Sequence, residues 1–189
     1  MLHDPATHRT LGADLRALRK ARGLTLAGMA AALDRSVGWM SQVERDLSEP
    51  GIEDLRQIAS LLNVPLSILF GQSNAPAHEA GHIVRAASRR AIGSGEAGLV
   101  EELLSPDLTD DFEVVHSTFA PGAAIDAPIR RATQEVGYLV SGRLHLTITG
   151  TLHKLGPGDS FRIRGEDHTW ANPYDTPAVV IWVIAPPVY

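Results

Sequence analysis

The N-terminal third of the chain repeats its hydrophobic positions with the period of an α-helix. Leu11, Leu15 and Leu18 share one face of a segment that runs to Gly23, where glycine favours a helix end. Thr25 stands where the next helix needs an N-cap. The pattern predicts helices within residues 11–23, 24–33, 36–45, 52–63 and 65–71.

Residues 72–82 are small, polar and proline-containing, which is typical of a linker. Beyond them the hydrophobic period becomes two, and turn signals such as GPGD and NPYD separate β-branched and aromatic runs. Strands are expected within residues 112–120, 135–142, 143–150, 159–164 and 178–187. Short strands with close turns favour an antiparallel sandwich or barrel. The fold class is therefore multidomain α and β: a five-helix domain at 9–71, a linker at 72–82, and a β domain at 83–189.

The composition limits the chemistry that this chain can carry. It has 189 residues, no cysteine and a formal net charge of −5. Without cysteine, disulfides, thiolate zinc sites and cysteine nucleophiles are excluded. No apolar run reaches the roughly 18 residues of a membrane span, and the first residues lack the apolar core of a secretory signal. We expect a cytoplasmic protein that does not enter a membrane.

The acidic excess is confined to the C-terminal part of the chain. Residues 9–72 hold eight basic and seven acidic side chains, whereas residues 73–189 hold nine basic and fourteen acidic ones. The overall charge therefore does not argue against nucleic-acid binding by the helical part.

The segments 24–33 and 36–45 have the pattern of two short helices joined by a tight turn. In the second of them Met40 and Val43 are spaced to face inward, while Ser41 and Gln42 lie elsewhere on its surface. Glutamine can pair bidentately with the edge of an adenine, and serine can bond to a base or a phosphate. A five-helix bundle with solvated polar residues fits the same pattern, so the residues alone leave both alternatives open.

Residues 9–71 resemble the phage-repressor type of helix-turn-helix domain in xenobiotic-response-element-like regulators. The matching stretches are LRALRKARGLTLAGMAAAL, SVGWMSQVER and LRQIASLLNVPLSILFG. The resemblance implies that Glu44 forms a scaffold ion pair with Arg19. The chain departs from the family pattern at Leu26, where the family often has glutamine, and at Trp39, which is a large side chain for its position. The DNA contacts that it implies are Ser36, Val37, Gly38, Ser41 and Gln42, with Arg16, Arg35 and Arg45 as candidates for the phosphate backbone.

The β half resembles the cupin superfamily, a family of jelly-roll barrels, through two stretches. They are PGAAIDAPIRRATQEVGYLVSGRLHLTITG and LGPGDSFRIRGEDHTWANP. The residues that match the cupin motifs are Gly122, Glu135, Gly142, His168 and Asn172. Pro128 and Arg130 replace two histidine ligands, so Glu135 and His168 are a partial metal-ligand set. Because this ligand set is incomplete, we expect no bound metal or other cofactor.

The chain also resembles the hydroxypropylphosphonate epoxidase type of enzyme, which fuses a helix-turn-helix domain to an iron-binding cupin. Arg131 stands where that enzyme type has a histidine, and a guanidinium cannot ligate iron. His116 or His145 could substitute only from another strand. A metal-dependent cupin enzyme of the oxygenase, epoxidase or epimerase type is therefore the alternative to a regulator without catalysis.

We expect the chain to be a homodimeric transcriptional regulator that binds a double-stranded DNA operator. Its barrel is expected to bind a small-molecule effector, although a dry barrel that only dimerises fits the same residues. The strand expected at 178–187 is apolar on both faces, which suits a subunit interface. The expected effector-binding residues are Arg130, Arg131, Glu135, Tyr138, His168 and Trp170.

Overall fold

The computed structural model describes residues 10–70, 78–79, 81–92 and 95–187. The chain forms two compact units. One contains the chain up to Arg90 together with Pro106–Thr109, and the other contains Ala91–Ser105 and the chain from Asp110 onward. Residues 83–90, which the sequence assigns to the β domain, therefore group with the helices. Most of the predicted linker at 72–82 lies outside the described residues.

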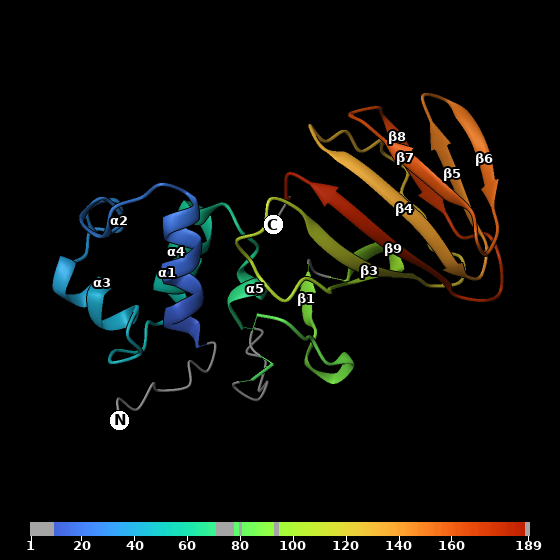
Figure 1. The fold of residues 1–189 in the computed structure, drawn as a ribbon. Coiled ribbons are helices and arrows are strands. Elements are labelled where there is room, and N and C mark those ends of the chain that lie inside the picture. The colour runs from blue at the N-terminus through green and yellow to red at the C-terminus, as the bar shows by residue number, and fades with distance from the viewer. Residues whose placement is uncertain (1–9, 71–77, 80, 93–94, 188–189) are drawn as a thin grey trace. The chain divides into compact units, whose positions relative to one another are not determined.

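The helical unit contains the helices that the hydrophobic pattern predicts (Figure 1). They are α1 (Leu11–Ala21), α2 (Leu26–Ala32), α3 (Val37–Val43), α4 (Ile52–Leu62) and α5 (Leu66–Phe70). Thr10, Thr25 and Ser36 each accept a hydrogen bond from the backbone three residues later, at 3.2, 2.9 and 3.0 Å. These N-caps explain where the first three helices begin.

The helices meet around one apolar core. Its fully buried side chains are Leu15, Leu18, Met29, Met40, Ile58, Leu62 and Ile68. Gly12 allows α1 to approach α3 closely, because a Cβ at this position would lie 2.4 Å from the carbonyl oxygen of Val43. Among the described residues, no helix combines the length and the apolar character that a membrane span requires.

The second unit is built from two antiparallel sheets that face each other as a jelly roll (Figure 1). The larger sheet has the order β1-β2-β3-β9-β4-β7, and the smaller one has the order β6-β5-β8. The strands are β1 (Arg90–Ile92), β2 (Leu99–Leu103), β3 (Glu113–Phe119), β4 (Gln134–Ser141), β5 (Leu144–Ile148), β6 (Thr151–Leu155), β7 (Ser160–Ile163), β8 (His168–Ala171) and β9 (Ala178–Ala185).

The sequence predicts β3, β4, β5, β7 and β9 but misses the other strands. β1 and β8 are only three and four residues long, and β6 is exposed along almost its whole length. Strands that are short or exposed on both faces lack a clear two-residue hydrophobic period. Hydrogen bonding to a neighbouring strand, rather than their own pattern, places them in the sheets.

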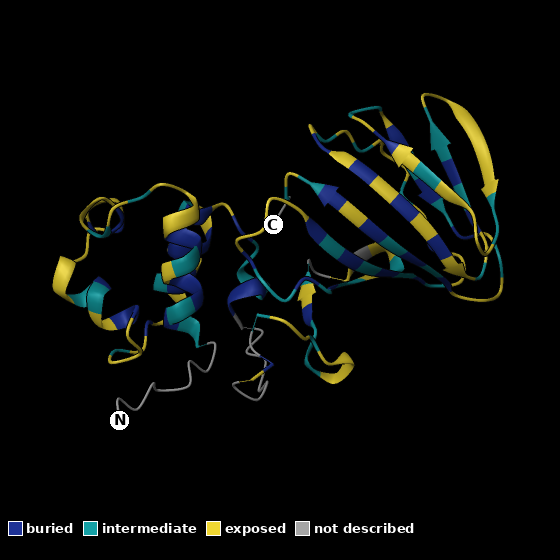
Figure 2. Ribbon diagram, in the orientation of Figure 1, coloured by how far each residue is buried: buried dark blue, intermediate teal, exposed yellow. Residues whose placement is uncertain are grey.

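Burial alternates along β3 and β9 and along β4 as far as Val140 (Figure 2). One set of side chains points into the barrel, where it forms the core, and the other set lies on the outer face of the larger sheet. The inward set includes Val115, Phe119, Leu139, Val180, Trp182 and Ile184. Because the inner face is predominantly apolar, the few ionisable side chains among these strands that also point inward are conspicuous.

Candidate functional sites

The turn between α2 and α3 is tight because Asp34 adopts a left-handed backbone conformation, with φ of 52°. Aspartate tolerates this region better than most residues. The backbone N–H of Arg35 then donates to the carbonyl of Ala30 at 2.9 Å, which closes the end of α2. Ser36 follows directly as the N-cap of α3. The result is a short turn that fixes α3 against α2.

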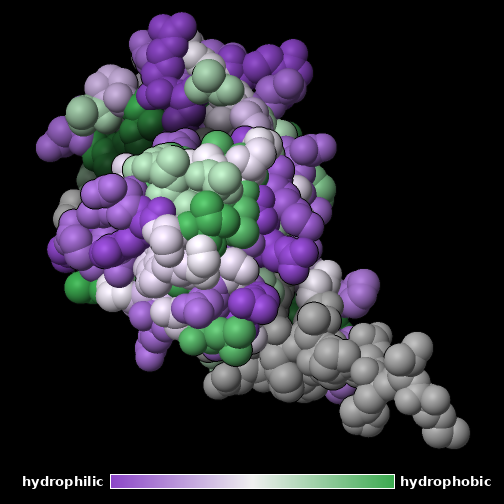
Figure 3. Space-filling view, turned by 90° about the vertical axis from the view of Figure 1, so that its left-hand side faces the viewer, coloured by the Kyte–Doolittle hydropathy of each residue, from purple (hydrophilic) through white to green (hydrophobic). Residues whose placement is uncertain are grey.

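α3 presents one arc of its surface to solvent. Val37 is 47% exposed, and Gly38 and Gln42 are also exposed, whereas Met40 and Val43 are buried against the helical core. Figure 3 views this side of the molecule, where a paler and greener band is bordered by hydrophilic side chains. The predicted DNA-contacting residues on and beside α3 are Ser36, Val37, Gly38, Ser41, Gln42 and Arg45, and all are exposed except Ser41, which is half-buried.

A buried ion pair fixes the other side of α3. The Nε of Arg19 donates to Oε1 of Glu44 at 2.5 Å, and its Nη2 donates to Oε2 at 3.0 Å. The remaining nitrogen, Nη1, donates to the carbonyl of Leu24 at 2.7 Å. The hydrogen bond to Glu44 raises the pKa of Arg19 further above its ordinary value, against the opposing effect of burial. The predicted scaffold pair is confirmed, and it connects α1 to the end of α3.

The three arginines proposed for the phosphate backbone differ in their surroundings. Arg35 donates from Nε and Nη2 to Oδ1 of Asp54, at 3.0 and 2.6 Å, and its guanidinium lies 5.3 Å from the ring centre of Trp39. Arg35 thus already has an ion-pair partner and an aromatic neighbour, and its contact with the phosphate backbone stays a prediction. Arg45 is exposed, with Nε donating to the carbonyl of Ser41 at 3.1 Å. Arg16 is exposed on α1.

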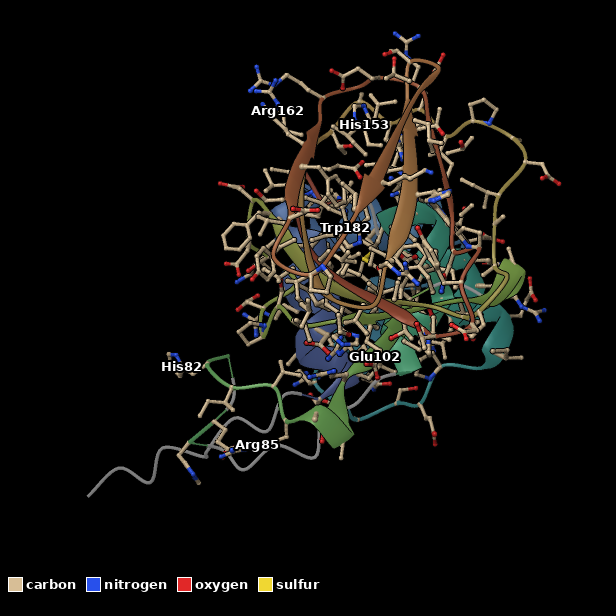
Figure 4. All side chains as sticks on the ribbon, turned by 90° about the vertical axis from the view of Figure 1, so that its right-hand side faces the viewer. His82, Arg85, Glu102, His153, Arg162 and Trp182 are labelled. Atoms are coloured by element: carbon tan, nitrogen blue, oxygen red, sulfur yellow. The ribbon has the colours of Figure 1, made fainter. Side chains whose placement is uncertain are left out.

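The barrel contains a cavity of about 40 Å³, called here the barrel pocket. Its described lining residues are Leu99, Glu101, Phe119, Ile129, Arg131, Glu135, His168, Trp170, Trp182 and Ile184. The fold therefore brings together four residues that the sequence proposed for effector binding, Arg131, Glu135, His168 and Trp170. In Figure 4, Trp182 lies within the barrel, whereas Arg162 extends from its outside.

Two polar groups of the barrel pocket, Glu135 and His168, are buried and sparsely paired. Glu135, which is 2% exposed, accepts a hydrogen bond from the hydroxyl of Thr133 at 2.6 Å. His168 is 5% exposed, and its Nδ1 lies 3.2 Å from the carbonyl oxygen of Glu166. Because a carbonyl can only accept, Nδ1 carries the proton, and in the neutral imidazole Nε2 is left as an acceptor.

Glu101 is a second carboxylate in the barrel pocket, and the sequence analysis missed it. Burial raises the pKa of Glu101 above its ordinary value, although the hydrogen bond from Ser117 and the positive charge of Arg131 act in the opposite direction. The negative charge of Glu135 adds to the increase. The signal was the sequence LVEEL, since alternation along a strand must turn one of the two adjacent glutamates inward. Phe119 and Trp182 also line the pocket, and the sequence analysis did not name them.

Two residues expected in the pocket lie elsewhere. Tyr138 is 50% exposed on the outer face of β4, because it stands three residues after Glu135 and an odd spacing reverses the direction of a strand side chain. Arg130 precedes the inward-lying Arg131, and its side chain is 73% exposed at 4.0 Å from Asp167. Neither Tyr138 nor Arg130 lines the barrel pocket, so both expectations were wrong.

The barrel residues do not fit the metal site that is common in cupins. Among the described residues, no group of three or more histidine, aspartate or glutamate side chains is arranged to hold an ion. His116 lies on the outer face of β3, 3.7 Å from Glu102, and Nε2 of His145 lies 3.1 Å from the hydroxyl of Tyr174. Neither histidine lines the pocket, so neither replaces the missing ligands. That the protein works without a metal stays a prediction.

Asn172 of the second cupin motif has a structural role. Its Nδ2 donates to the carbonyl oxygens of Phe119, Ala120 and Thr176 at 3.0, 3.2 and 2.9 Å, and the residue is fully buried. These bonds tie the end of β3 to the loop before β9. The position therefore serves the barrel architecture and does not face the pocket.

Comparisons with known proteins agree with this architecture. The Helix-turn-helix domain family matches residues 10–67, and the Cupin domain family matches residues 115–184. The HTH-type transcriptional regulator SutR of Escherichia coli (strain K12) is 28% identical over 166 residues, covering 87% of this chain and 88% of the relative. The HTH-type transcriptional regulator PuuR of the same organism is 25% identical over 165 residues, covering 85% of this chain and 86% of the relative.

A solved structure, an HTH_3 family transcriptional regulator from Vibrio cholerae, is 23% identical with a TM-score of 0.44 and covers 94% of this chain and 95% of its own. The matching curated relatives carry the names of regulators and not of enzymes. Each of the two units of this chain thus matches its own domain family, and the relatives span both units. The chain therefore contains a helix-turn-helix domain and a C-terminal cupin domain, and over most of its length it is similar to helix-turn-helix transcriptional regulators.

Proposed function

We propose that this regulator binds its operator as a homodimer, reads the base sequence with α3, and changes its DNA binding when a small molecule enters the barrel pocket. The observation that carries the proposal is the exposed arc of α3. Its exposed side chains include a glutamine and a serine cap, and the buried Arg19–Glu44 pair holds the opposite side of the helix. A rigid helix with a free polar face suits the major groove of DNA.

Gln42 is the side chain of α3 best suited to direct base reading. It is exposed, and an amide can bond to both N6 and N7 of adenine, whereas arginine contacts to phosphate carry no sequence information. Replacing Gln42→Ala should therefore weaken binding to the specific operator by about 1–3 kcal/mol and leave non-specific binding nearly unchanged.

The measurement needs an operator, which selection of bound fragments from a genomic pool supplies. Fluorescence anisotropy at fixed salt then compares the selected fragment with a scrambled one. Gln57→Ala, an exposed glutamine on α4, is the matched control and should bind both fragments like the unchanged protein. Equal losses of specific and non-specific binding by Gln42→Ala would show that Gln42 does not read bases.

A homodimer is supported by the outer face of the larger sheet. Its apolar centre, called here the outer patch, consists of Val114, Val136, Tyr138, Val140, Val179, Ile181 and Val183. The strand β9 lies at the middle of this patch with β3 and β4 on its two sides. A two-fold axis along β9 would exchange β3 and β4 between copies, so apolar rows would meet apolar rows. Exposed patches of this kind mark interaction surfaces.

Dimerisation would match the geometry of an operator. Two recognition helices related by a two-fold axis read half-sites about 34 Å apart, which is one turn of B-DNA. An effector changes transcription only if it binds more tightly to one arrangement of the two DNA-binding units than to another. The barrel pocket is the proposed place for that effector, and we propose no metal or other cofactor.

A further inference from the structure

We infer that the barrel pocket recognises a small primary ammonium group, held between Glu101 and Glu135 with Nε2 of His168 as a third acceptor. The inference deepens the proposed function, since it rests on the barrel pocket being the effector site. It commits to a chemical class of ligand, primary amines with a short carbon chain. The argument uses the charge, the hydrogen-bonding groups and the size of the pocket.

The charge balance of the pocket calls for a cation. Of its ten described lining residues, Glu101 and Glu135 carry negative charges and Arg131 carries the one permanent positive charge. The charge of Arg131 lowers the pKa of Glu101, but no salt bridge joins Arg131 to either carboxylate among the residues that the structure describes. One negative charge is thus left over in a buried cavity, where an unpaired charge is costly. Burial is the main cause that raises the pKa of Glu101, so a cationic partner would stabilise the charged form of this carboxylate.

Three groups of the pocket can accept hydrogen bonds from a ligand. Glu135 is bonded by Thr133 and Glu101 by Ser117, and each carboxylate has further lone pairs. His168 adds Nε2, because Nδ1 is engaged with the carbonyl of Glu166. Three acceptor groups match the three N–H donors of a primary ammonium. The donors of the lining are Arg131 and the indole N–H groups of Trp170 and Trp182, so the charge balance, and not the number of donors and acceptors, is what favours an ammonium.

The remaining walls and the size agree with this class. Phe119, Trp170 and Trp182 border the pocket, and aromatic rings attract ammonium ions by cation–π interaction. The cavity of about 40 Å³ has room for about three water-sized sites. It therefore takes the ammonium and the first one or two carbons of a ligand. A carboxylate ligand would pair with Arg131 but would face both glutamates and increase the excess of negative charge.

The test uses the tryptophans as built-in reporters. The chain has three of them, with Trp170 and Trp182 at the pocket and Trp39 in the helical unit. We would titrate the full-length protein with ethylammonium chloride and follow the indole N–H signals by ¹H–¹⁵N NMR, assigned by single Trp→Phe variants. A three-atom ligand is limited to about millimolar affinity, which NMR measures well. Trp170 and Trp182 should shift and saturate, while Trp39 should not.

Variants and companion ligands separate the inference from weaker explanations. Glu135→Gln should weaken ethylammonium binding about tenfold or more, because it removes a charge-assisted bond to the ammonium. Glu102→Gln, the neighbouring glutamate of Glu101 on the outer face, is the matched control and should bind normally. Tetramethylammonium has the charge but no N–H donors, and sodium acetate has the opposite charge, so neither should saturate the pocket signals.

The pH dependence provides an independent check. Ethylammonium stays charged well above neutrality, whereas the raised pKa of Glu101 means that this side chain takes up its proton at a higher pH than an ordinary glutamate does. Affinity should therefore fall as the pH is lowered and Glu101 becomes protonated. Glu101→Gln should make that fall smaller.

Failure of the inference can be told apart from failure of the proposed function, since operator binding is measured separately by anisotropy. Saturation by acetate but not by ethylammonium, or unchanged binding by Glu135→Gln, would overturn the ammonium inference even if acetate altered operator affinity. Saturation of the pocket signals by ethylammonium, with the loss in Glu135→Gln, would support the inference even if operator affinity did not change. In that case only the proposed effector role would be contradicted.

Discussion

At the scale of single residues, the two units treat buried charge in opposite ways. In the helical unit, Arg19 and Glu44 meet with both hydrogen bonds satisfied, and their side chains are 10% and 6% exposed. In the barrel, Glu101 and Glu135 have hydroxyl partners but no ion pair among the described residues. A satisfied pair fixes a scaffold, whereas a charge without a partner is available to a ligand.

The Arg19–Glu44 pair gives the first prediction. Arg19→Met leaves the carboxylate of Glu44 buried without its partner, so the helical unit should lose about 3–5 kcal/mol of unfolding free energy. The double variant Arg19→Met with Glu44→Leu should recover much of the loss, because apolar packing often replaces a buried pair. Urea denaturation followed by circular dichroism at 222 nm, where the helices dominate the signal, measures both.

The matched control is an ion pair of the same chemistry at the surface. Arg56 and Glu53 on α4 lie 3.4 Å apart with side chains that are 62% and 70% exposed. Arg56→Met should change stability by less than about 1 kcal/mol. If Arg19→Met proved equally mild, or if the double variant recovered nothing, the pair would not have the scaffold role that its burial indicates.

The sequence predicted the candidate sites only as far as a local pattern could carry them. Glu135 and His168 were found because the cupin motifs fix their positions, and Glu44 because the helix-turn-helix pattern does. Tyr138 faces away from the pocket because side chains three residues apart on a strand point to opposite sides. Glu101 lies outside both motifs, and it reaches the pocket because β2 pairs with β3, a register that the sequence does not state.

At the scale of elements, caps and turns matter more than propensity. The first three helices begin where a threonine or serine caps them, which made their positions predictable. The strands that were missed depend on partners distant in sequence, as β8 does on β5. Turns between strands also need left-handed backbone conformations. The sequence indicates these only where a motif contains a glycine.

Gly142, in the turn between β4 and β5, gives a prediction at this scale. Its φ is +75°, and a Cβ there would lie 2.2 Å from the carbonyl oxygen of Pro177. Gly142→Ala should therefore add a clash to the left-handed strain and destabilise the barrel by about 2–4 kcal/mol. Gly122→Ala is the matched control, since φ is +73° but no atom lies within 4 Å, so only about 1–2 kcal/mol should be lost. Thermal unfolding followed by tryptophan fluorescence compares the two, and equal losses would contradict the close approach at Pro177.

At the scale of the whole molecule, the two faces of the same strands serve two proposed purposes. Along β9, Trp182 lines the barrel pocket while Ile181 and Val183 belong to the outer patch. Along β4, Glu135 points inward and Val136 points outward. A ligand that shifts these strands would act on the pocket and the outer patch together, which is the kind of shared element that coupling between two sites requires.

The last prediction tests whether a second copy covers the outer patch. Val183 lies in the middle strand of the patch, is 44% exposed, and pairs across the sheet with Val114 and Val136. Val183→Lys should place a charge at the centre of the interface and convert the dimer to a monomer in sedimentation-velocity experiments. The barrel itself should stay folded, because this side chain does not enter the core.

Leu152→Lys on β6, which is 51% exposed on the smaller sheet, is the matched control and should leave the dimer intact. Operator affinity should fall in Val183→Lys alone, since a monomer reads one half-site; a dimer that survives Val183→Lys would place the subunit interface elsewhere.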